Sequence, residues 1–343
     1  DIAEDKARRA TVQTERARLI QKMNAAKKGG NYGGRFLWRL VILLLIGYVH
    51  SLFYRGDILT LYAMLGIFLI PFYKVQNKWL LGIAALLFLG LGRYISFFLT
   101  GGDSIWGGTF DIDPSAVWVQ EYYDLIKNGS LFDVFEANSI AGHWDKLEYQ
   151  FGIFGRGYYT FAFFMIGLYA GRTNFFKNFK ERKKLTKKVL IWASVILLIS
   201  FGLLAAIFAS LGENVTFDNW TAIFGLSAFD ISNMAMTFLW IALFVMLYRK
   251  GKGEKILENL APYGRMALTN YVLQSIIGTF LLYGWGLGLI GKLPNLHTFL
   301  IALILIGIQI WLSKVWLRYF HYGPLEWVWR CLTFFKVFPM RKK

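Results

Sequence analysis

The stretch VLIWASVILLISFGLLAAIFAS, residues 189–210, decides the fold class of this chain. It carries no charged side chain, and it exceeds the ~20 residues that a helix needs to cross a hydrocarbon core of roughly 30 Å. A helix is required there because each backbone N–H and C=O must be bonded within the segment where water is absent. The stretch therefore predicts a transmembrane helix.

Seven further stretches are apolar enough to cross a membrane, and the composition agrees with this interpretation. Hydrophobic residues make up 56% of the 343 residues and charged residues only 17%, which excludes a disordered chain, a collagen and a coiled coil. The single Cys331 excludes an intrachain disulfide scaffold. We therefore expect an all-α, polytopic bundle of eight transmembrane helices, over residues 36–53, 58–73, 79–99, 153–171, 189–210, 222–248, 266–290 and 297–317.

The basic residues are distributed unevenly among the connections. Of the 38 Lys and Arg, 29 lie in residues 1–35, 172–188 and 249–264, in the tail from Arg318, and at Lys74 and Lys78. Lys and Arg are concentrated on the cytoplasmic side of membrane proteins. Both termini are therefore predicted to be cytoplasmic, in a bacterial inner membrane. The net charge of +17 is assigned to anionic lipid at that surface and not to nucleic acid.

Three parts of the chain follow from this topology. Residues 1–35 are expected to form a basic cytoplasmic amphipathic segment, residues 36–318 the bundle, and residues 319–343 a cytoplasmic interfacial helix with a basic tail. Residues 100–152 form a long outer connection with nine Asp and Glu against two Lys. Such a long connection is typical of a functional region. Short amphipathic helices are predicted there, over 117–127 and 130–137.

Ionisable side chains at the outer end of the first stretch form one candidate site. His50, Arg55 and Asp57 lie within GYVHSLFYRGDILTLYAMLG, residues 47–66. A His beside a carboxylate can act as a general base at neutral pH, because the carboxylate orients the ring and stabilises its cation. The alternative is an interfacial His, with Arg55 and Asp57 forming an ion pair that caps the turn.

Two arginines occupy membrane stretches or their outer ends, where charge is costly. Arg93 and Arg156 would either extend to the outer interface or converge to bind an anionic acceptor, and Arg55 and Arg93 are the candidate substrate-binding residues. Asp230, within the sixth stretch, leads us to expect that this helix starts near Ala228.

Two cytoplasmic stretches carry polar residues at helical spacing. In GRMALTNYVLQS, residues 264–275, Asn270 and Gln274 lie one turn apart, as do Arg265 and Thr269. These residues would either bond neighbouring helices or face a ligand. In HYGPLEWVWRCLTFF, residues 321–335, Glu326 and Arg330 lie four positions apart, a spacing that suits an ion pair on a helix. No metal site is expected, since the His, Cys and carboxylate spacing does not fit one.

The chain resembles the YeiB-like bacterial membrane proteins, domain-of-unknown-function family 418. The resemblance rests on residues 47–66, on GRMALTNYVLQSIIGTFLLYGWGLGL (264–289), on GPLEWVWRCLTFF (323–335) and on FFMIGLYAGR (163–172). It covers roughly residues 36–335. Members usually begin with a further membrane segment bearing an LDALRG-like motif, which does not precede Arg35 here. Because the sequence starts at Asp1 and not at Met, we expect residues upstream, and the segment either lies there or has been lost.

The family is grouped with membrane acyltransferases such as the heparan-glucosaminide acetyltransferases, which move an acyl group from cytoplasmic acyl-CoA to a carbohydrate across the membrane. The resemblance implies that His50 and Asp57 are catalytic, on the acceptor side. The residues implied to face acyl-CoA, the donor substrate, are Arg172, Arg265, Thr269, Asn270, Gln274, Glu326 and Arg330. No permanently bound cofactor is implied.

Three functions remain open from the sequence. The first is a transmembrane O- or N-acyltransferase that acts on an extracytoplasmic glycan or glycolipid. The second is a transporter or flippase for an amphipathic substrate, although the paired repeats of many transporters are not visible. The third is a non-catalytic subunit of a membrane complex, with the acidic outer region as its docking surface. Expected partners are membrane lipids, the glycan acceptor, and a second copy or other subunits, but no nucleic acid.

Overall fold

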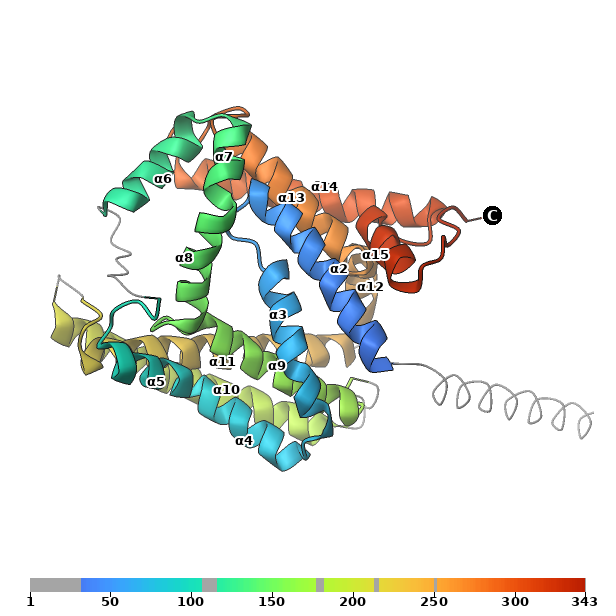
Figure 1. Cartoon of the computed structure of the whole chain (residues 1–343). Coiled ribbons are helices and arrows are strands. Elements are labelled where there is room, and N and C mark those ends of the chain that lie inside the picture. The colour runs from blue at the N-terminus through green and yellow to red at the C-terminus, as the bar shows by residue number, and fades with distance from the viewer. Residues whose placement is uncertain (1–31, 107–115, 177–181, 213–215, 250–251, 343) are drawn as a thin grey trace, which may run out of the picture.

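The computed structural model describes residues 32–106, 116–176, 182–212, 216–249 and 252–342, and within them the chain is all-α. These residues form fourteen α-helices and one 3-10 helix, η1 (Figure 1). The predicted amphipathic segment 1–35 lies almost wholly outside them. The helices are α2 (Tyr32–Phe53), α3 (Leu59–Leu69), η1 (Ile70–Lys74), α4 (Asn77–Phe88), α5 (Leu91–Thr100), α6 (Val117–Asn128), α7 (Leu131–Asn138), α8 (Ile140–Phe151), α9 (Arg156–Arg172), α10 (Lys183–Leu211), α11 (Trp220–Arg249), α12 (Lys252–Arg265), α13 (Ala267–Leu282), α14 (Asn295–Tyr319) and α15 (Pro324–Phe334).

Four of the described helices, α2, α10, α11 and α14, are long and apolar enough to cross a membrane. The pair α4 and α5 passes the same test if it counts as one span bent by 51°. Apolar side chains cover the outside of these helices: Leu198 of α10 is 73% exposed and Ile199 66%. Such a surface needs lipid around it. The chain is therefore a multi-pass membrane protein with four or five candidate spans in its described part.

The expected count of eight crossings is not confirmed, because four of the eight apolar stretches form short or broken helices. One of them, 153–171, forms the 17-residue α9. Pro71 coincides with the change from α3 to the 3-10 helix η1, as expected of a residue that lacks an N–H for the α-helical ladder. Gly90 takes a φ of +96°, which separates α4 from α5. In the seventh stretch, α13 ends at Leu282, before the glycine-rich sequence that begins at Gly284.

The sixth stretch is a continuous helix rather than a shortened one. The expectation that it starts near Ala228 is wrong, because α11 begins at Trp220 and carries Asp230 in its interior. Asp230 is tolerated there because two arginines pair with it.

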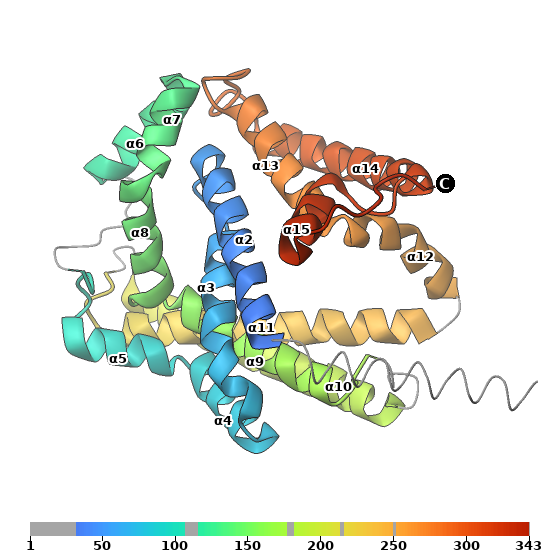
Figure 2. The ribbon, with the colours of Figure 1, turned by 45° about the vertical axis from the view of Figure 1, so that its right-hand side comes forward.

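The described residues of 116–152, part of the predicted outer connection, fold against the other helices. The two predicted amphipathic helices are confirmed as α6 and α7, and a third helix, α8, follows them. A capping box between Ser130 and Asp133 starts α7. Helix α8 runs from α7 to the ends of α5 and α9, which it contacts (Figure 2). It thereby places polar side chains such as Lys146 and Gln150 beside α2 and α3.

Helices α2 and α3 lie side by side, and a glycine permits their close approach (Figures 1 and 2). A Cβ atom added to Gly47 of α2 would lie 2.7 Å from the backbone nitrogen of Thr60 and 2.9 Å from Cβ of Leu59. Backbone atoms cannot yield to such a contact without separating the helices. The turn between these two helices carries Asp57, so Gly47 helps to set where that carboxylate lies.

The variant Gly47→Ala is expected to lower the free energy of unfolding by roughly 1–3 kcal/mol, the usual range for overpacking. Thermal unfolding of the detergent-solubilised protein measures it. Gly82→Ala in α4 is the matched control, since its added Cβ meets no atom within 4 Å and alanine favours a helix interior by about 0.5–1 kcal/mol. Equal stabilities for the two variants would contradict the role assigned to Gly47.

Candidate functional site

A buried histidine–aspartate pair lies where α2 turns into α3. His50, in the last turn of α2, is 2% exposed, and Asp57, in the turn, is 5% exposed. The Nδ1 atom of His50 lies 2.7 Å from Oδ1 of Asp57. The ion pair between Arg55 and Asp57, which is the alternative interpretation of the sequence, does not form between these described residues, since Asp57 pairs with His50 and Arg55 with Asp145.

Hydrogen bonds from the start of α3 hold the Asp57 carboxylate in place. The backbone nitrogen of Leu59 donates to Oδ1 at 3.1 Å, and the backbone nitrogen and Oγ1 of Thr60 donate to Oδ2 at 2.9 and 2.8 Å. Burial raises the pKa of Asp57, but the hydrogen bonds from His50, Thr60 and Leu59 outweigh it and keep this pKa below its usual value. Asp57 is therefore an ionised acceptor at neutral pH.

An ionised Asp57 determines the tautomer of His50. Because the carboxylate can only accept, Nδ1 of His50 carries the proton and donates it, and a neutral ring then has its lone pair on Nε2. This Nε2 atom is buried and has no hydrogen-bond partner among the described residues. Nε2 of His50 is therefore a buried base, and the hydrogen bond from Nδ1 to Asp57 fixes the orientation of its ring.

Aromatic side chains separate the pair from a cavity between α13 and α14. The ring of His50 lies 5.0 Å from that of Tyr271 and 6.3 Å from that of Tyr54, between centroids. Both tyrosines line a cavity of about 400 Å³, together with Gln274, Ser275 and other residues of α13 and α14. Of the residues predicted to face acyl-CoA, Gln274 is the one that lies at this cavity.

A second cavity, of about 280 Å³, adjoins Asp57 on the side of α8. Asp57 and Thr60 line it with Lys146 and Gln150, and Leu44, Leu45 and Met64 are among its apolar walls. The Nζ atom of Lys146 and Oε1 of Gln150 are buried and have no partner in the described chain. Burial lowers the pKa of Lys146, and the positive charge of Arg55 lowers it further. The Asp57 carboxylate raises this pKa but does not offset the other two effects, so the pKa of Lys146 lies below its usual value.

Arg55, predicted to bind substrate, contacts α6 and α8. Its guanidinium pairs with Asp145 of α8 and lies 4.4 Å from the ring centre of Tyr122 in α6. It therefore joins α6 and α8 beside the turn that carries Asp57.

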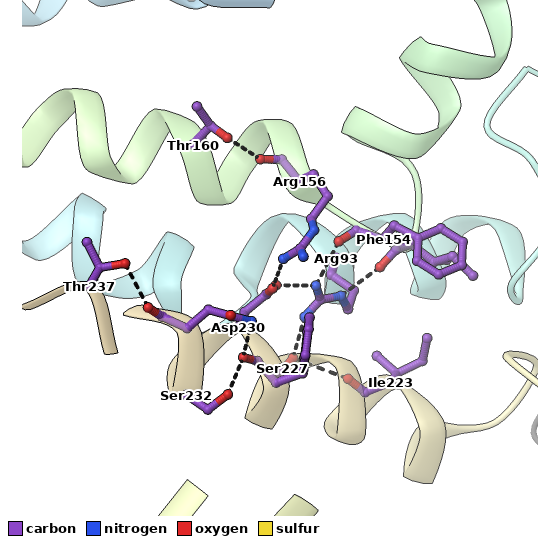
Figure 3. A network of polar contacts seen from close by, with 12 residues as sticks. Arg93, Phe154, Arg156, Thr160, Ile223, Ser227, Asp230, Ser232 and Thr237 are labelled. Atoms are coloured by element: carbon purple, nitrogen blue, oxygen red, sulfur yellow. Dashed lines mark hydrogen bonds and ion pairs between the residues drawn. The ribbon is translucent and has the colours of Figure 1, made fainter. Parts of the chain in front are cut away.

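Arg93, the other predicted substrate-binding residue, is buried in a network with Asp230 and Arg156 (Figure 3). The Nε of Arg93 donates to the carbonyl of Ile153 at 2.6 Å, and its Nη atoms donate to the carbonyl of Phe154, to Ser227 and to Asp230. Nη1 of Arg156 donates to the other Asp230 oxygen at 2.5 Å. The two arginines do converge, but on a carboxylate of α11, and they join α5, α9 and α11.

Arg172 contacts the carbonyl groups that end η1. It donates to the carbonyl oxygens of Phe72, Tyr73 and Val75 and to the side chain of Asn77. It thus connects the end of α9 to the connection between η1 and α4, a position apart from the other residues predicted to face acyl-CoA.

Most of those other residues form contacts between α13, α14 and α15. Glu326 of α15 accepts from the backbone nitrogen of Thr269 at 3.1 Å and from its Oγ1 at 2.5 Å. Asn270 donates to Oγ of Ser313 at 2.9 Å, and Arg265 donates to the carbonyl of His321 at 3.3 Å.

Arg330 has aromatic partners. Its guanidinium lies over the rings of Tyr322, Phe334 and Phe338, while Glu326 bonds to Thr269. The expected pair between Glu326 and Arg330 is therefore not formed between these two described residues.

Lys146, Gln150 and Tyr271 are site residues that were not predicted from the sequence. A signal existed for Lys146, one of two bases in an acidic region. Its place beside Asp57 depends on how α8 packs, which helical periodicity does not determine. Among the described residues, no group of three or more His, Cys, Asp or Glu could hold a metal ion.

The fold and this geometry define a multi-pass helical membrane protein with a buried His–Asp pair beside two cavities. Residues 170–336 match the family model described as "Protein of unknown function (DUF418)". The "Uncharacterized protein YxaH" of Bacillus subtilis is 30% identical, over 95% of this chain and 78% of the relative. The chain therefore belongs to the DUF418 family, which confirms the resemblance noted from its motifs.

Other relatives are more distant. The "Uncharacterized protein YeiB" of Escherichia coli is 28% identical, over 86% of this chain and 74% of the relative. The "Uncharacterized 39.9 kDa protein in amylase 3'region" of Bacillus acidopullulyticus is 24% identical, over 93% and 77%. No solved structure matches the chain.

Proposed function

We propose that the protein is a membrane acyltransferase that moves an acyl group from cytoplasmic acyl-CoA to a hydroxyl or amine of an extracytoplasmic glycan or glycolipid. The observation that carries this proposal is the buried His50–Asp57 pair, with Nδ1 bonded to the carboxylate and Nε2 without a partner among the described residues. The family's grouping with membrane acyltransferases is a second, weaker support.

The reaction follows from the tautomer of His50. Nε2 takes the proton of the acceptor O–H or N–H while the acceptor atom attacks the thioester carbonyl carbon of acyl-CoA. The tetrahedral intermediate collapses as the carbon–sulfur bond breaks, and the imidazolium returns the proton to the leaving thiolate. Asp57 stabilises the imidazolium without taking its proton, since its carboxylate already accepts three other hydrogen bonds.

The proposal includes an orientation in the membrane. The positive-inside distribution supports a chain with both termini in the cytoplasm of a bacterial cell and, with the shorter apolar helices counted, eight crossings of its inner membrane. His50, Asp57, Arg55 and Arg93 then belong to the acceptor side. The donor side then holds Arg172, Arg265, Thr269, Asn270, Gln274, Glu326 and Arg330, where arginines suit the phosphates of CoA.

Membrane vesicles of defined orientation test this function. Radiolabelled acetyl-CoA, which does not cross the bilayer, is supplied to inverted and to right-side-out vesicles that contain the full-length protein. We expect label on a carbohydrate or lipid in the inverted vesicles only, because only these expose the cytoplasmic face. Vesicles without the protein are the control.

Two results would count against the proposal. Equal labelling in both orientations would contradict transfer across the membrane. No label, together with no binding of acyl-CoA, would favour a transporter for an amphipathic substrate or a non-catalytic subunit instead.

A further inference from the structure

Arg156 extends from the buried arginine–aspartate network to a further cavity, of about 420 Å³, between α3, α8, α9 and α11. A guanidinium has five N–H donors, and the hydrogen bond described for this one is Nη1 to Asp230 (Figure 3). The rings of Tyr159 and Phe229 lie on its flanks, 5.7 and 5.3 Å from its centre. Arg156 therefore retains donors for a ligand in this cavity.

The network carries more positive than negative charge. Two guanidinium groups, of Arg93 and Arg156, share the single carboxylate of Asp230. Excess charge is costly when it is removed from water, unless a counter-charge is present. The side chain of Arg93 is 3% exposed and that of Arg156 is 29% exposed. An anion could thus reach the excess charge at Arg156, from the cavity.

The cavity at Arg156 adjoins the cavity at Lys146, because Leu61 and Gln150 line both. Lys146 adds a second positive group whose Nζ has no hydrogen-bond partner in the described chain, and Gln150 contributes an unpaired Oε1. The carboxylate of Glu148, between them in sequence, accepts instead from Oγ of Ser104 and the backbone nitrogen of Ile105.

The cavity at Lys146 is also lined by Asp57, Thr60, His143 and Gln150, and that at Arg156 by Gln150, Thr160, Asn233 and Thr237; the carboxylate of Asp57 is held by His50, Leu59 and Thr60. The remaining walls are apolar or aromatic. Leu44, Leu45, Met64 and Leu147 line the cavity at Lys146, and Tyr62, Tyr159, Met236 and Trp240 line that at Arg156. Trp240 is 54% exposed on the apolar surface of α11. Positive groups in pockets between membrane helices bind acidic head groups, while such walls suit hydrocarbon.

We propose that the two adjoining cavities form a binding site for an acidic amphiphile, a molecule with a phosphate or carboxylate on an apolar chain, and that Arg156 and Lys146 bind its anionic group. Arg156 suits this role because its planar fork matches phosphate and carboxylate oxygens. The site does not require acyl transfer, and its test does not use activity.

Binding to the full chain in detergent tests the site, with dioctanoyl phosphatidic acid as the probe and the shift in unfolding temperature as the signal. Dioctanoyl phosphatidylcholine has the same chains without net negative charge, and inorganic phosphate has the charge without chains. We expect phosphatidic acid to bind at least about tenfold more tightly than either, because both charge pairing and apolar burial are available to it.

Variants locate the site. Arg156→Gln and Lys146→Met are each expected to weaken phosphatidic acid binding about tenfold, the loss of a charge-assisted hydrogen bond. Arg156→Lys retains the charge and is expected to lose less than Arg156→Gln. Arg318→Gln, at an exposed position outside both cavities, should bind as the wild type does. Lys146→Met does not alter the Asp230 network, so it remains informative if Arg156→Gln fails to fold.

Three outcomes would overturn the proposal. Equal affinity for phosphatidic acid and phosphatidylcholine would show that charge is not recognised. If inorganic phosphate binds as tightly as phosphatidic acid, the site is one for a free anion and not for an amphiphile. If a folded Lys146→Met variant binds phosphatidic acid as tightly as the wild type, the binding site does not lie at Lys146. His50→Ala should retain binding whatever its transfer activity, which separates failure of this site from failure of the proposed reaction.

Discussion

Replacing Asp230 with alanine is expected to lower the free energy of unfolding by about 3–5 kcal/mol, the cost of removing one partner from a buried ion pair. Asp230 is 4% exposed and accepts hydrogen bonds from both Arg93 and Arg156. Without it, the guanidinium of Arg93 remains buried with only neutral acceptors. Thermal or denaturant unfolding in detergent measures the change.

A surface substitution and a compensating double variant control this experiment. Asp103→Ala removes an exposed carboxylate and should change stability by no more than about 0.5 kcal/mol. Arg93→Met combined with Asp230→Leu should recover part of the loss, since apolar replacement of a buried pair is often close to neutral. If Asp230→Ala is as stable as Asp103→Ala, the network does not hold α5, α9 and α11 together.

The network of Arg93, Arg156 and Asp230 shows why the sequence predicts the class of fold more reliably than it predicts contacts between side chains. Apolar length alone identifies long helices such as α10 and α14. It does not show whether a charge inside such a stretch ends the helix or finds a partner. Asp230 led to a predicted start near Ala228, yet its partners come from positions 74 and 137 residues away in the chain, so local pattern could not supply them.

The count of crossings is not confirmed for a related reason. The stretch 266–290 is apolar enough by hydropathy to have the length of a span, and 58–73 is apolar but shorter. The α-helix of 58–73 changes to the 3-10 helix η1 near Pro71, and α13 ends before Gly284, because backbone chemistry and not hydropathy ends an α-helix. Helix ends are therefore less predictable than the presence of the helices.

The candidate site was partly visible in the sequence. His50 and Asp57 lie only seven residues apart, and the pairing of a His with a carboxylate near one helix end was foreseeable from that spacing. Lys146 and Gln150 lie about 90 residues further along and reach the site through the packing of α8. The resemblance to a family could not supply them either, because its motifs do not include α8.

His50→Ala is expected to reduce acyl transfer by roughly 10²–10⁴-fold, the usual contribution of a positioned general base. The loss should appear in kcat/KM, because the acceptor hydroxyl or amine must lose a proton as it attacks the thioester carbon. The label-transfer assay in inverted vesicles measures the loss, and the unfolding temperature shows whether the variant is folded. Full transfer in a folded His50→Ala protein would rule out His50 as the base.

A substitution at Asp57 tests whether the carboxylate is needed to orient the His50 ring and fix its tautomer, while the base itself is retained. Asp57→Asn retains the size of the side chain but offers an amide that can donate, so His50 is no longer required to carry its proton on Nδ1. Where the amide donates to Nδ1, the proton moves to Nε2 and the base is blocked. We therefore expect Asp57→Asn to lose most of the transfer that His50→Ala loses, although the imidazole remains. Tyr54→Phe, which keeps the ring beside His50, is the matched control and should retain transfer. A fully active Asp57→Asn protein would mean that the carboxylate serves only to start α3, and that His50 does not depend on it for its tautomer.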